Sequence, residues 1–409
     1  MNKFLISIAA CSGLAILSAC DDDTTNVSEA EVKQNYVAMA HAAYSDSLMT
    51  AKLLKSSVES FIATPTEANL ELARAAYKEA RIPYQQSEIM RWDSVITVGD
   101  NLDLAADGGP SSVDEWEGQV NAWPLDENHI DAIIAGNQAI NLDLLIAENG
   151  ADDNDANVTT GVHAVEYMLW GADTHGTDAG AGERAASDFA NDGSCADTLC
   201  QRRADYLMAA TELLVTDLTD MLAEWTPTAQ QTSGTLAHNF VNSDLAIDYM
   251  VGSIRAMATD ELASARMNSG LLLGDPEEEH DCFSDLSHVA IYYNFQGVKN
   301  AFYGKYQSSA HSVTGASLAD LIKSKNKDSF NRIDSALSSI ETKMYQILEV
   351  GERAQNPIKF DQIIGQSTDG AERVIAKSAV NELISLDVEL VLLKEILSLQ
   401  YIDSAGDGD

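Results

Sequence analysis

Apolar side chains recur at intervals of three or four residues along most of this chain, which is the spacing that places them on one face of an α-helix. The first stripe begins near Ser28, whose spacing to Glu31 is that of a capping box. We therefore expect a long helix here with one face turned inward. The apolar members of this stripe are Val37, Ala40, Tyr44, Leu48, Ala51, Leu54, Val58 and Phe61.

A second helix is predicted to follow directly. Thr64 has the position of its N-cap, Pro65 that of its first helical residue, and Glu67 can reach back to the cap. The pattern continues to about Arg91. Three further stripes predict long helices: Leu207, Leu214, Leu218, Met221 and Trp225; Ile333, Leu337, Ile340, Met344 and Ile347; and Leu383, Leu386, Leu390, Leu393 and Leu397.

Polar, glycine-bearing loops are predicted at residues 99–114, 171–198 and 308–317. The second follows a candidate site directly, and we expect it to be a flexible connection or a cover. Alternating strand patterns with tight hairpin turns are missing from the sequence, which argues against a sheet-based domain.

These helices predict an all-α protein with two four-helix-bundle-like domains packed side by side. A length of roughly 150 residues per domain is consistent with this division of the mature chain. We place the N-terminal bundle at residues 28–200, the C-terminal bundle at 201–402 and a disordered tail at 403–409.

The N-terminus has the features of an export signal. Lys3 precedes a short apolar run, and the sequence Leu-Ser-Ala ends at Cys20, as in the cleavage site of a bacterial lipoprotein. This predicts removal of residues 1–19, a lipid on Cys20 and an acidic tether over residues 20–27; an uncleaved anchor is the alternative. No other segment has the roughly 20 apolar residues of a spanning helix. We therefore expect a lipid-anchored protein of a bacterial cell envelope, on the periplasmic or outer-membrane face.

Acidic residues outnumber basic ones by 64 to 25, which gives a formal net charge of −39. Such a charge argues against binding to nucleic acid or to anionic lipid headgroups, and it attracts cations. Most of these carboxylates are expected to lie on a solvated surface.

Three cysteines remain for an oxidising compartment once the signal is removed and Cys20 is lipidated: Cys195, Cys200 and Cys282. Cys195 and Cys200 enclose a short loop and are the favoured disulfide partners. The sequence has no Cys-x-x-Cys pair, which argues against a thiolate metal site.

The strongest candidate for chemistry is the segment Gly-Val-His-Ala-Val-Glu-Tyr-Met-Leu-Trp-Gly at residues 161–171. His163 and Glu166 stand three positions apart, so their side chains share a helical face and could hold one metal ion. The alternatives are a hydrogen-bonded core histidine and a carboxylate on the helix surface. Two ligands are too few for a metal site, so others must come from distant segments.

Two other segments offer carboxylates in unusual surroundings. Glu88 stands between aromatic residues at helical spacing, and a buried carboxylate there must be paired or bind a metal. Its alternative role is an ion pair with Arg91 or Arg81. Asp126 ends an acidic stretch that holds tryptophans and a proline, and its alternative role is to cap a helix near Asn128.

Four blocks of this sequence together resemble the imelysin family. They are Ala-Arg-x-x-Tyr-x-x-x-Glu ending at Glu88, Trp-Glu-Gly-x-Val-Asn-Ala-Trp-Pro-Leu-Asp ending at Asp126, Gly-x-His-x-x-Glu ending at Glu166, and Glu-His-Asp-Cys-Phe-Ser-Asp-Leu-Ser-His ending at His288. The last block has Asp281 where the family usually has serine. The resemblance spans most of the mature chain.

The resemblance implies an exported protein of two four-helix bundles with a polar site near their interface. It carries His163 and Glu166 over directly as site residues, and Glu88 and Asp126 as further members. It also brings in a second polar cluster with no assigned role: His280, Cys282, Ser284, Asp285 and His288.

The resemblance also implies a function. Family members are frequently iron-regulated, the family was first named for an insulin-cleaving metallopeptidase, and a related domain occurs in ferrous-iron uptake. One imidazole with several carboxylates suits iron, manganese or calcium, and the His-Glu-x-x-His motif of zinc peptidases is missing. We therefore expect a metal-binding lipoprotein of iron uptake or homeostasis, with iron as the metal and zinc as the alternative.

Its expected partners are the membrane, iron or an iron chelate, and iron-transport components. The alternative function is a metallopeptidase in which Glu166 is catalytic, and a third is a structural interaction module.

Overall fold

The chain is described by a computed structural model over residues 27–91, 97–98, 101–102, 116–227 and 235–400. The predicted signal sequence, Cys20 with its tether, the tail at 403–409 and most of the predicted loop at 99–114 lie outside these residues. The described part is mostly helical, with only short strands, so the predicted all-α class is confirmed.

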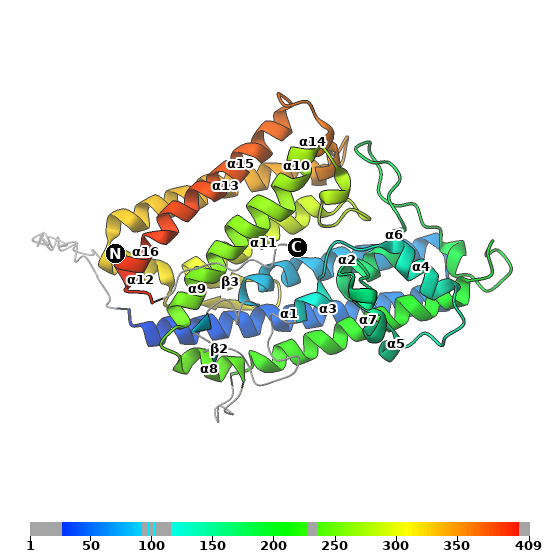
Figure 1. The fold of residues 1–409 in the computed structure, drawn as a ribbon, viewed down its shortest axis with the longest axis horizontal. Coiled ribbons are helices and arrows are strands. Elements are labelled where there is room, and N and C mark those ends of the chain that lie inside the picture. The colour runs from blue at the N-terminus through cyan, green and yellow to red at the C-terminus, as the bar shows by residue number, and fades with distance from the viewer. Residues whose placement is uncertain (1–26, 92–96, 99–100, 103–115, 228–234, 401–409) are drawn as a thin grey trace, which may run out of the picture.

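The first bundle consists of four helices that pack against one another (Figure 1). The apolar stripe predicted for its first helix is confirmed, because every member of that stripe is buried. The bundle helices are α1 (Glu29–Ala63), α2 (Glu67–Ser87), α6 (Gly161–Trp170) and α7 (Cys200–Glu224).

The second bundle consists of three single helices and one long composite rod. The single helices are α11 (Ser287–Tyr303), α13 (Lys327–Glu352) and α15 (Ala371–Val391). The rod runs through α9 (Ala246–Arg255), the π-helical segment η5 (Ala256–Asn268) and α10 (Ser269–Leu273). Helix α11 also packs against α2, so the two bundles meet along these two helices.

Helix α7 does not follow the predicted division of the chain. Its residues from 201 onward were assigned to the C-terminal bundle, yet the helix packs against α1 and α6. Its buried residues Leu207, Leu214 and Leu218 complete the first bundle. The polypeptide therefore enters the second bundle only after α7.

Helix caps explain where the first two helices begin. Ser28 forms the predicted capping box with Glu31, in which each side chain accepts a hydrogen bond from the other residue's backbone. Helix α2 starts later than predicted: Thr66, not Thr64, is its N-cap and accepts from the backbone of Asn69 at 3.3 Å. Pro65 consequently precedes the helix.

Short elements connect these bundles. The helices are α3 (Glu117–Val120), α4 (Glu127–Ala135), α5 (Leu142–Glu148), α8 (Leu236–Asn242), α12 (Leu318–Lys325), α14 (Phe360–Gly365), α16 (Leu393–Leu397), η1 (Glu88–Met90), η3 (Ala151–Asp153), η4 (Ala186–Phe189) and η6 (Pro276–Glu278). The strands are β1 (Thr97–Val98), β2 (Asn101–Leu102), β3 (Lys305–Gln307) and β4 (Ser312–Thr314).

The hairpin of β3 and β4 was not predicted, since the segment from residue 308 was expected to be a loop. The strands pair in antiparallel fashion with Tyr306 opposite Val313. The hydroxyl of Tyr306 donates to Oδ2 of Asp46 in α1 at 2.9 Å, which fixes the hairpin to the first bundle. Three residues per strand are too few to leave an alternating pattern in the sequence.

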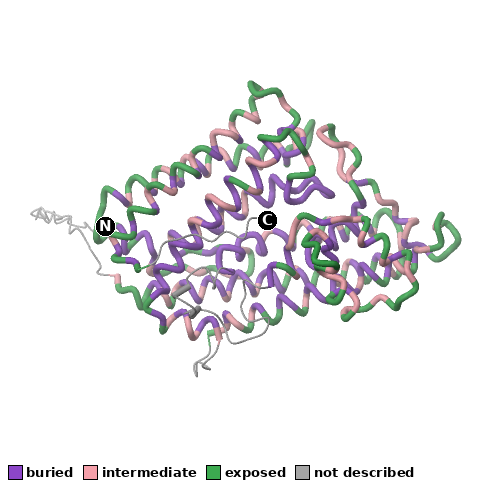
Figure 2. Tube along the Cα trace, viewed as in Figure 1, coloured by how far each residue is buried: buried purple, intermediate pink, exposed green. Residues whose placement is uncertain are grey.

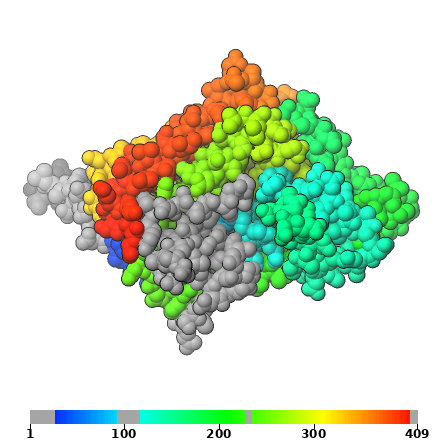
Figure 3. Space-filling view, viewed as in Figure 1, coloured from blue at the N-terminus to red at the C-terminus, as the bar shows by residue number. Residues whose placement is uncertain are grey.

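Burial follows the bundle seams: the inner faces of the long helices are buried and their outer faces are exposed (Figure 2). In the space-filling view, the residues that follow 116 form the surface at one end of the molecule, next to α10 (Figure 3). Within the described residues, none of the helices combines the length and the apolar character needed to cross a membrane.

Candidate metal centre

Helix α6 carries the His163 motif, and all of its residues are buried. It begins at Gly161, which has a φ of 74°. A Cβ atom at this position would collide with the carbonyl oxygen of Val120, at the end of α3. Because only glycine permits both this conformation and this approach, the first residue of the motif sets α6 directly against α3.

His163 and Glu166 face each other on α6, as predicted. Nδ1 of His163 lies 3.0 Å from Oε2 of Glu166, and both side chains are fully buried. A proton must lie between these atoms, because two unprotonated acceptors at this distance would repel each other. The other ring nitrogen of His163, Nε2, is buried and has no hydrogen-bond partner among the described residues. Such an unsatisfied buried atom is uncommon and is typical of a functional site.

The loop between η6 and α11 completes the site. Ser284 donates to Oε1 of Glu166 from its backbone nitrogen at 3.0 Å and from its hydroxyl at 2.6 Å. Asp281, on the same loop, places a ligand atom within 4.8 Å of ligand atoms of His163 and Glu166. The candidate metal centre therefore consists of His163, Glu166 and Asp281, with residues drawn from segments far apart in the chain.

Two residues of α2 support this group. Arg81 donates from Nε to Oδ1 of Asp281 at 2.9 Å and from Nη1 to Oδ1 of Asn121 at 2.9 Å. The hydroxyl of Tyr77 donates to Oε2 of Glu166 at 3.3 Å. The guanidinium compensates the buried charge of Asp281 and ties its loop to α2.

Burial determines the protonation of the centre. Desolvation, followed by the charge of Arg81, lowers the pKa of His163 to about 3. Desolvation, followed by the charge of Asp281, raises the pKa of Glu166 to about 8, against the opposing hydrogen bonds of Ser284. The imidazole is thus neutral near pH 7, as a metal ligand must be, while Glu166 carries a proton that a cation would displace.

Rings enclose the imidazole of His163. The Trp123 ring centroid lies 5.0 Å away, and the ring of His280 stands edge-on with centroids 4.7 Å apart. Phe283 lies against Trp123 at 5.8 Å. This shell keeps the surroundings apolar, and desolvation lowers the pKa of His280 well below its ordinary value too.

Glu88, predicted as a further ligand, does not join the centre. It forms an ion pair with Arg266 at 2.8 Å, in the bundle interior. Arg91, one partner considered from the sequence, pairs instead with Glu117 at 2.9 Å and with Glu261 at 3.1 Å. A guanidinium on the distant segment η5 therefore compensates Glu88, and its burial needs no metal.

Asp126, the other predicted member, does not join the centre either. It is half-buried and is the N-cap of α4, where Oδ1 accepts from the backbone nitrogen of Asn128 at 3.0 Å. The capping role weighed from the sequence is therefore the one that the structure shows.

The predicted second cluster is divided among several places. His280 and Ser284 lie at the candidate metal centre, whereas Asp285 lies close to two other acids, as described below. Nε2 of His288 lies 2.9 Å from Oε1 of Glu352. Cys282 is a buried free thiol, whose pKa burial raises well above its ordinary value.

Asp281 is the residue of the centre that sequence reasoning missed. Its only signal in the sequence is that it stands where serine is usual in this block. The departure from that pattern marked the position as uncertain, although it supplies a carboxylate to the centre.

The loop that follows α6, predicted to be a flexible connection or a cover, is bonded to α6 and to the loop that carries Asp281. The backbone nitrogen of Gly182 donates to the carbonyl of Phe283 at 2.9 Å, and that of Arg184 donates to the carbonyl of Trp170 at 2.7 Å. The guanidinium of Arg184 lies 4.9 Å from the ring centroid of Tyr167. The loop at residues 171–198 is thus fastened both to α6 and to the loop that carries Asp281.

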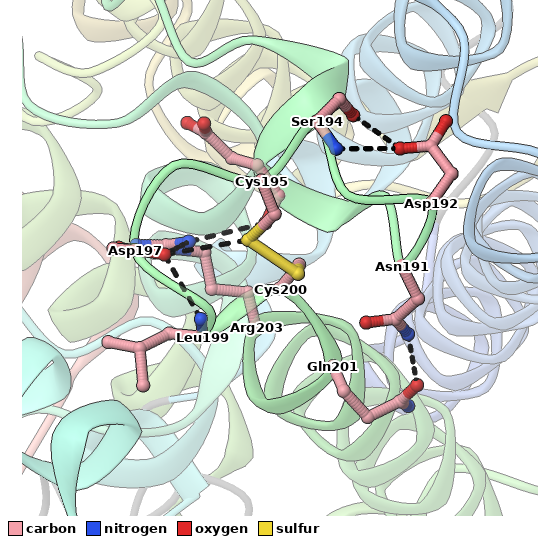
Figure 4. Close-up of a disulfide and its surroundings, with 10 residues drawn as sticks. Asn191, Asp192, Ser194, Cys195, Asp197, Leu199, Cys200, Gln201 and Arg203 are labelled. Carbon is pink, nitrogen blue, oxygen red and sulfur yellow. Dashed lines mark hydrogen bonds and ion pairs between the residues drawn. A yellow bond between two sulfur atoms is a disulfide. The ribbon is translucent and has the colours of Figure 1, made fainter.

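A disulfide fastens the C-terminal end of this loop to α7 (Figure 4). It joins Cys195 and Cys200, so the favoured pairing is confirmed. Between them, Asp197 accepts from the backbone nitrogen of Leu199 at 3.0 Å and pairs with Arg203 of α7.

Comparison with solved structures shows the same fold in two bacterial proteins. One is described as an iron-regulated protein A precursor from Parabacteroides distasonis ATCC 8503, with 18% identity and a TM-score of 0.61, covering 91% of this chain and 97% of that one. The other is an imelysin-like protein from Psychrobacter arcticum 273-4, with 15% identity and a TM-score of 0.60, covering 92% and 98%.

Comparison with curated proteins gave no match. Among protein families, the model described as Imelysin (Peptidase M75) matches residues 40–388. Because this match spans most of the chain, the protein belongs to the imelysin family.

Proposed function

We propose that this protein binds a metal ion, iron by preference, at His163, Glu166 and Asp281, and that it takes part in iron uptake or homeostasis. One observation carries the proposal. Three ligand atoms converge in a fully buried position, next to an imidazole nitrogen that has no hydrogen-bond partner among the described residues. A closed structural core would have satisfied that atom.

The ligand set supports iron over softer metals. One imidazole with two carboxylates is a nitrogen and oxygen set, and no thiolate of the described residues belongs to the group. Three protein ligands leave coordination positions open, which suits an ion that must be taken up and released. The name of the Parabacteroides relative, an iron-regulated protein, points the same way.

A cavity of about 100 Å³ lies beside the rings that enclose His163. It is lined by Trp123, His280 and Arg266, with the exposed acids Glu277 and Glu278 at its rim. Trp123 and His280 are also the rings that contact His163. Carboxylates at such a rim raise the local concentration of cations, as does the net charge of −39.

The direct test is a titration of the purified, chelator-treated protein with ferrous iron under anaerobic conditions, followed by elemental analysis. We expect one bound ion, and a loss of affinity of at least tenfold in His163→Ala and in Asp281→Asn. His238→Ala, which changes a histidine outside the centre, should bind as the wild type does. Equal binding in all four proteins would contradict the proposal.

The peptidase alternative is decided by the wild type and one further variant, Glu166→Gln. If insulin or another peptide is cleaved with a loaded metal, and Glu166→Gln abolishes the cleavage, the protein is a metallopeptidase. Glu166 already accepts two hydrogen bonds from Ser284 and contacts His163, which favours a positioning or ligand role over that of a free general base.

We also propose that the protein is exported and held in the cell envelope by a lipid on Cys20, near iron-transport components. The lipoprotein-like signal in the sequence supports this. Cys20→Ser should move the protein from the membrane fraction to the soluble fraction, and unchanged membrane association would exclude the lipid anchor.

A further inference from the structure

Beside the candidate metal centre lies a second group of buried acids, which we call the acid cluster: Glu279, Asp285 and Asp361. Glu279 and Asp285 belong to the loop before α11, and Asp361 belongs to α14. One carboxylate oxygen from each residue lies within 4.8 Å of the others. None of these residues belongs to the candidate metal centre, so the acid cluster is a separate site.

The acid cluster is deeply buried and has few donors nearby: the hydroxyl of Ser287 interacts with Glu279, and the backbone of Gln362 interacts with Asp361. The three residues are 1%, 3% and 0% exposed, respectively. Both oxygens of Glu279, both of Asp361 and Oδ1 of Asp285 lack a hydrogen bond of normal geometry in the described part of the chain. Because a buried carboxylate is unstable without a donor or a cation, these oxygens point to a ligand.

The ion pairs of the cationic side chains in this region are made with other acids. Arg81 pairs with Asp281, in the candidate metal centre. Lys359 immediately precedes α14, but its Nζ lies 3.6 Å from Glu352 and 3.5 Å from Nε2 of His288. The charge of Lys359 also opposes the rise that burial causes in the pKa values of Asp285 and Asp361, but a single cation shared with Glu352 does not compensate three clustered carboxylates.

We propose that the acid cluster binds one hard divalent cation, with a preference for calcium. Its donors are carboxylate oxygens alone, a set that favours calcium, magnesium or manganese over zinc and copper. Three carboxylates can offer up to six oxygens, and calcium takes six to eight in a flexible arrangement. Magnesium usually keeps several waters, for which so buried a cluster has little room.

A surface cavity gives such an ion access. Its volume is about 670 Å³, and its wall includes Asp285, Ser284, Lys359 and Gln362. Its lining shares no residue with that of the cavity beside His280.

The ion would also hold the loop that serves the candidate metal centre. Asp281 and Ser284 lie between Glu279 and Asp285 in the sequence, and they face His163 and Glu166. A cation shared by this loop and Asp361 would fasten the loop to α14. The inference does not rest on the proposed function, because the acid cluster would bind its ion even if the His163 group bound none.

Isothermal titration of the chelator-treated full chain with calcium chloride tests the proposal. We expect one site with a dissociation constant of about 10⁻⁴ to 10⁻³ M or tighter. Asp361→Asn and Glu279→Gln should each weaken binding at least tenfold and remove the calcium-dependent rise in melting temperature. The matched control is Asp369→Asn, an exposed acid next to α15, which should bind as the wild type does.

His163→Ala separates the two sites, since it should leave calcium binding within twofold of the wild type. Circular dichroism checks that each variant folds. If Asp361→Asn fails to fold, the calcium affinity of Glu279→Gln provides the test instead. The proposal would be overturned if both Asp361→Asn and Glu279→Gln bound calcium as tightly as the wild type. It would also be overturned if His163→Ala bound zinc more tightly than calcium. If the wild type bound no calcium, the proposal would also be overturned, and shared protons would explain how the three acids are buried together.

Discussion

Buried arginines show how single side chains keep acids in the interior of this protein. Arg266 pairs with Glu88 at 2.8 Å and with Glu261 at 2.8 Å, and all three side chains are almost fully buried. Removing the arginine would take this ion pair from Glu88 and leave Glu261 with Arg91 alone. Breaking buried pairs in this way costs about 3 to 5 kcal/mol, far more than the charge attraction contributes at a surface.

Arg266→Met should therefore lower the free energy of unfolding by about 3 kcal/mol or more. Arg332→Met is the matched control, because Arg332 pairs with Glu389 at the surface, and its loss should cost less than about 1 kcal/mol. Urea unfolding followed by circular dichroism measures both. Equal losses for the two variants would show that the buried network is not required for stability.

At this scale, the sequence predicts residues that act within one helix and misses those that depend on packing. His163 and Glu166 were found because one helical turn brings them together. Glu88 was correctly expected to need a cation when buried, but the arginine that supplies it lies on η5, and no local pattern links the two segments. Asp281 was missed for the same reason, since its neighbours come from α2 and α6.

Among the elements, α6 is the one whose position decides the candidate metal centre. Its start at Gly161 lies directly against the backbone at the end of α3. A side chain there would meet backbone atoms, which cannot rotate away, and the φ of 74° is unfavourable for any other residue. The helix that carries His163 is therefore held by a contact that only glycine allows.

Gly161→Ala should lower the free energy of unfolding by at least about 2 kcal/mol, since it adds both a backbone clash and an unfavourable φ. Gly118→Ala in α3 is the control, because a Cβ at that position meets nothing within 4 Å. It should be neutral or stabilising by up to about 1 kcal/mol. Thermal and urea unfolding give the comparison, and a harmless Gly161→Ala would refute the close contact.

Elements were predictable where a single period or cap defines them. The stripe of α1 and its capping box were correct, whereas α2 begins two residues after the predicted position because Thr66 replaces Thr64 as the cap. The hairpin of β3 and β4 depends on its contact with Asp46 in α1, and three-residue strands leave no period to detect.

At the scale of the whole molecule, the free energy of unfolding depends on pH because some of its many acids are buried. Asp217 of α7 is 4% exposed, and Oδ1 accepts from Nε2 of Gln119 at 2.8 Å. Burial raises the pKa of Asp217 to about 7, against the opposing hydrogen bond of Gln119. The folded state thus holds a proton that the unfolded state releases near pH 4, so this residue lowers stability as pH rises from 4 to 7.

Asp217→Asn should remove that part of the pH dependence. The variant and the wild type should be about equally stable at pH 4, and the variant should be more stable by about 4 kcal/mol at pH 8, because each unit by which burial raises the pKa is worth about 1.4 kcal/mol. Urea unfolding at a series of pH values measures the difference. A difference that does not grow between pH 4 and 7 would show that Asp217 titrates as an ordinary acid.

The two bundles were predictable from the stripes, but the place of α7 was not, because an amphipathic stripe does not say which partner it faces. Its location has a consequence for how the chain reaches its final form. Helices α1 and α2 emerge early from synthesis, yet the apolar surface that α7 covers stays open until residues 200–224 have followed. A fragment that stops before Cys200 would lack α7, leave the apolar faces of α1 and α6 open and remain prone to aggregate.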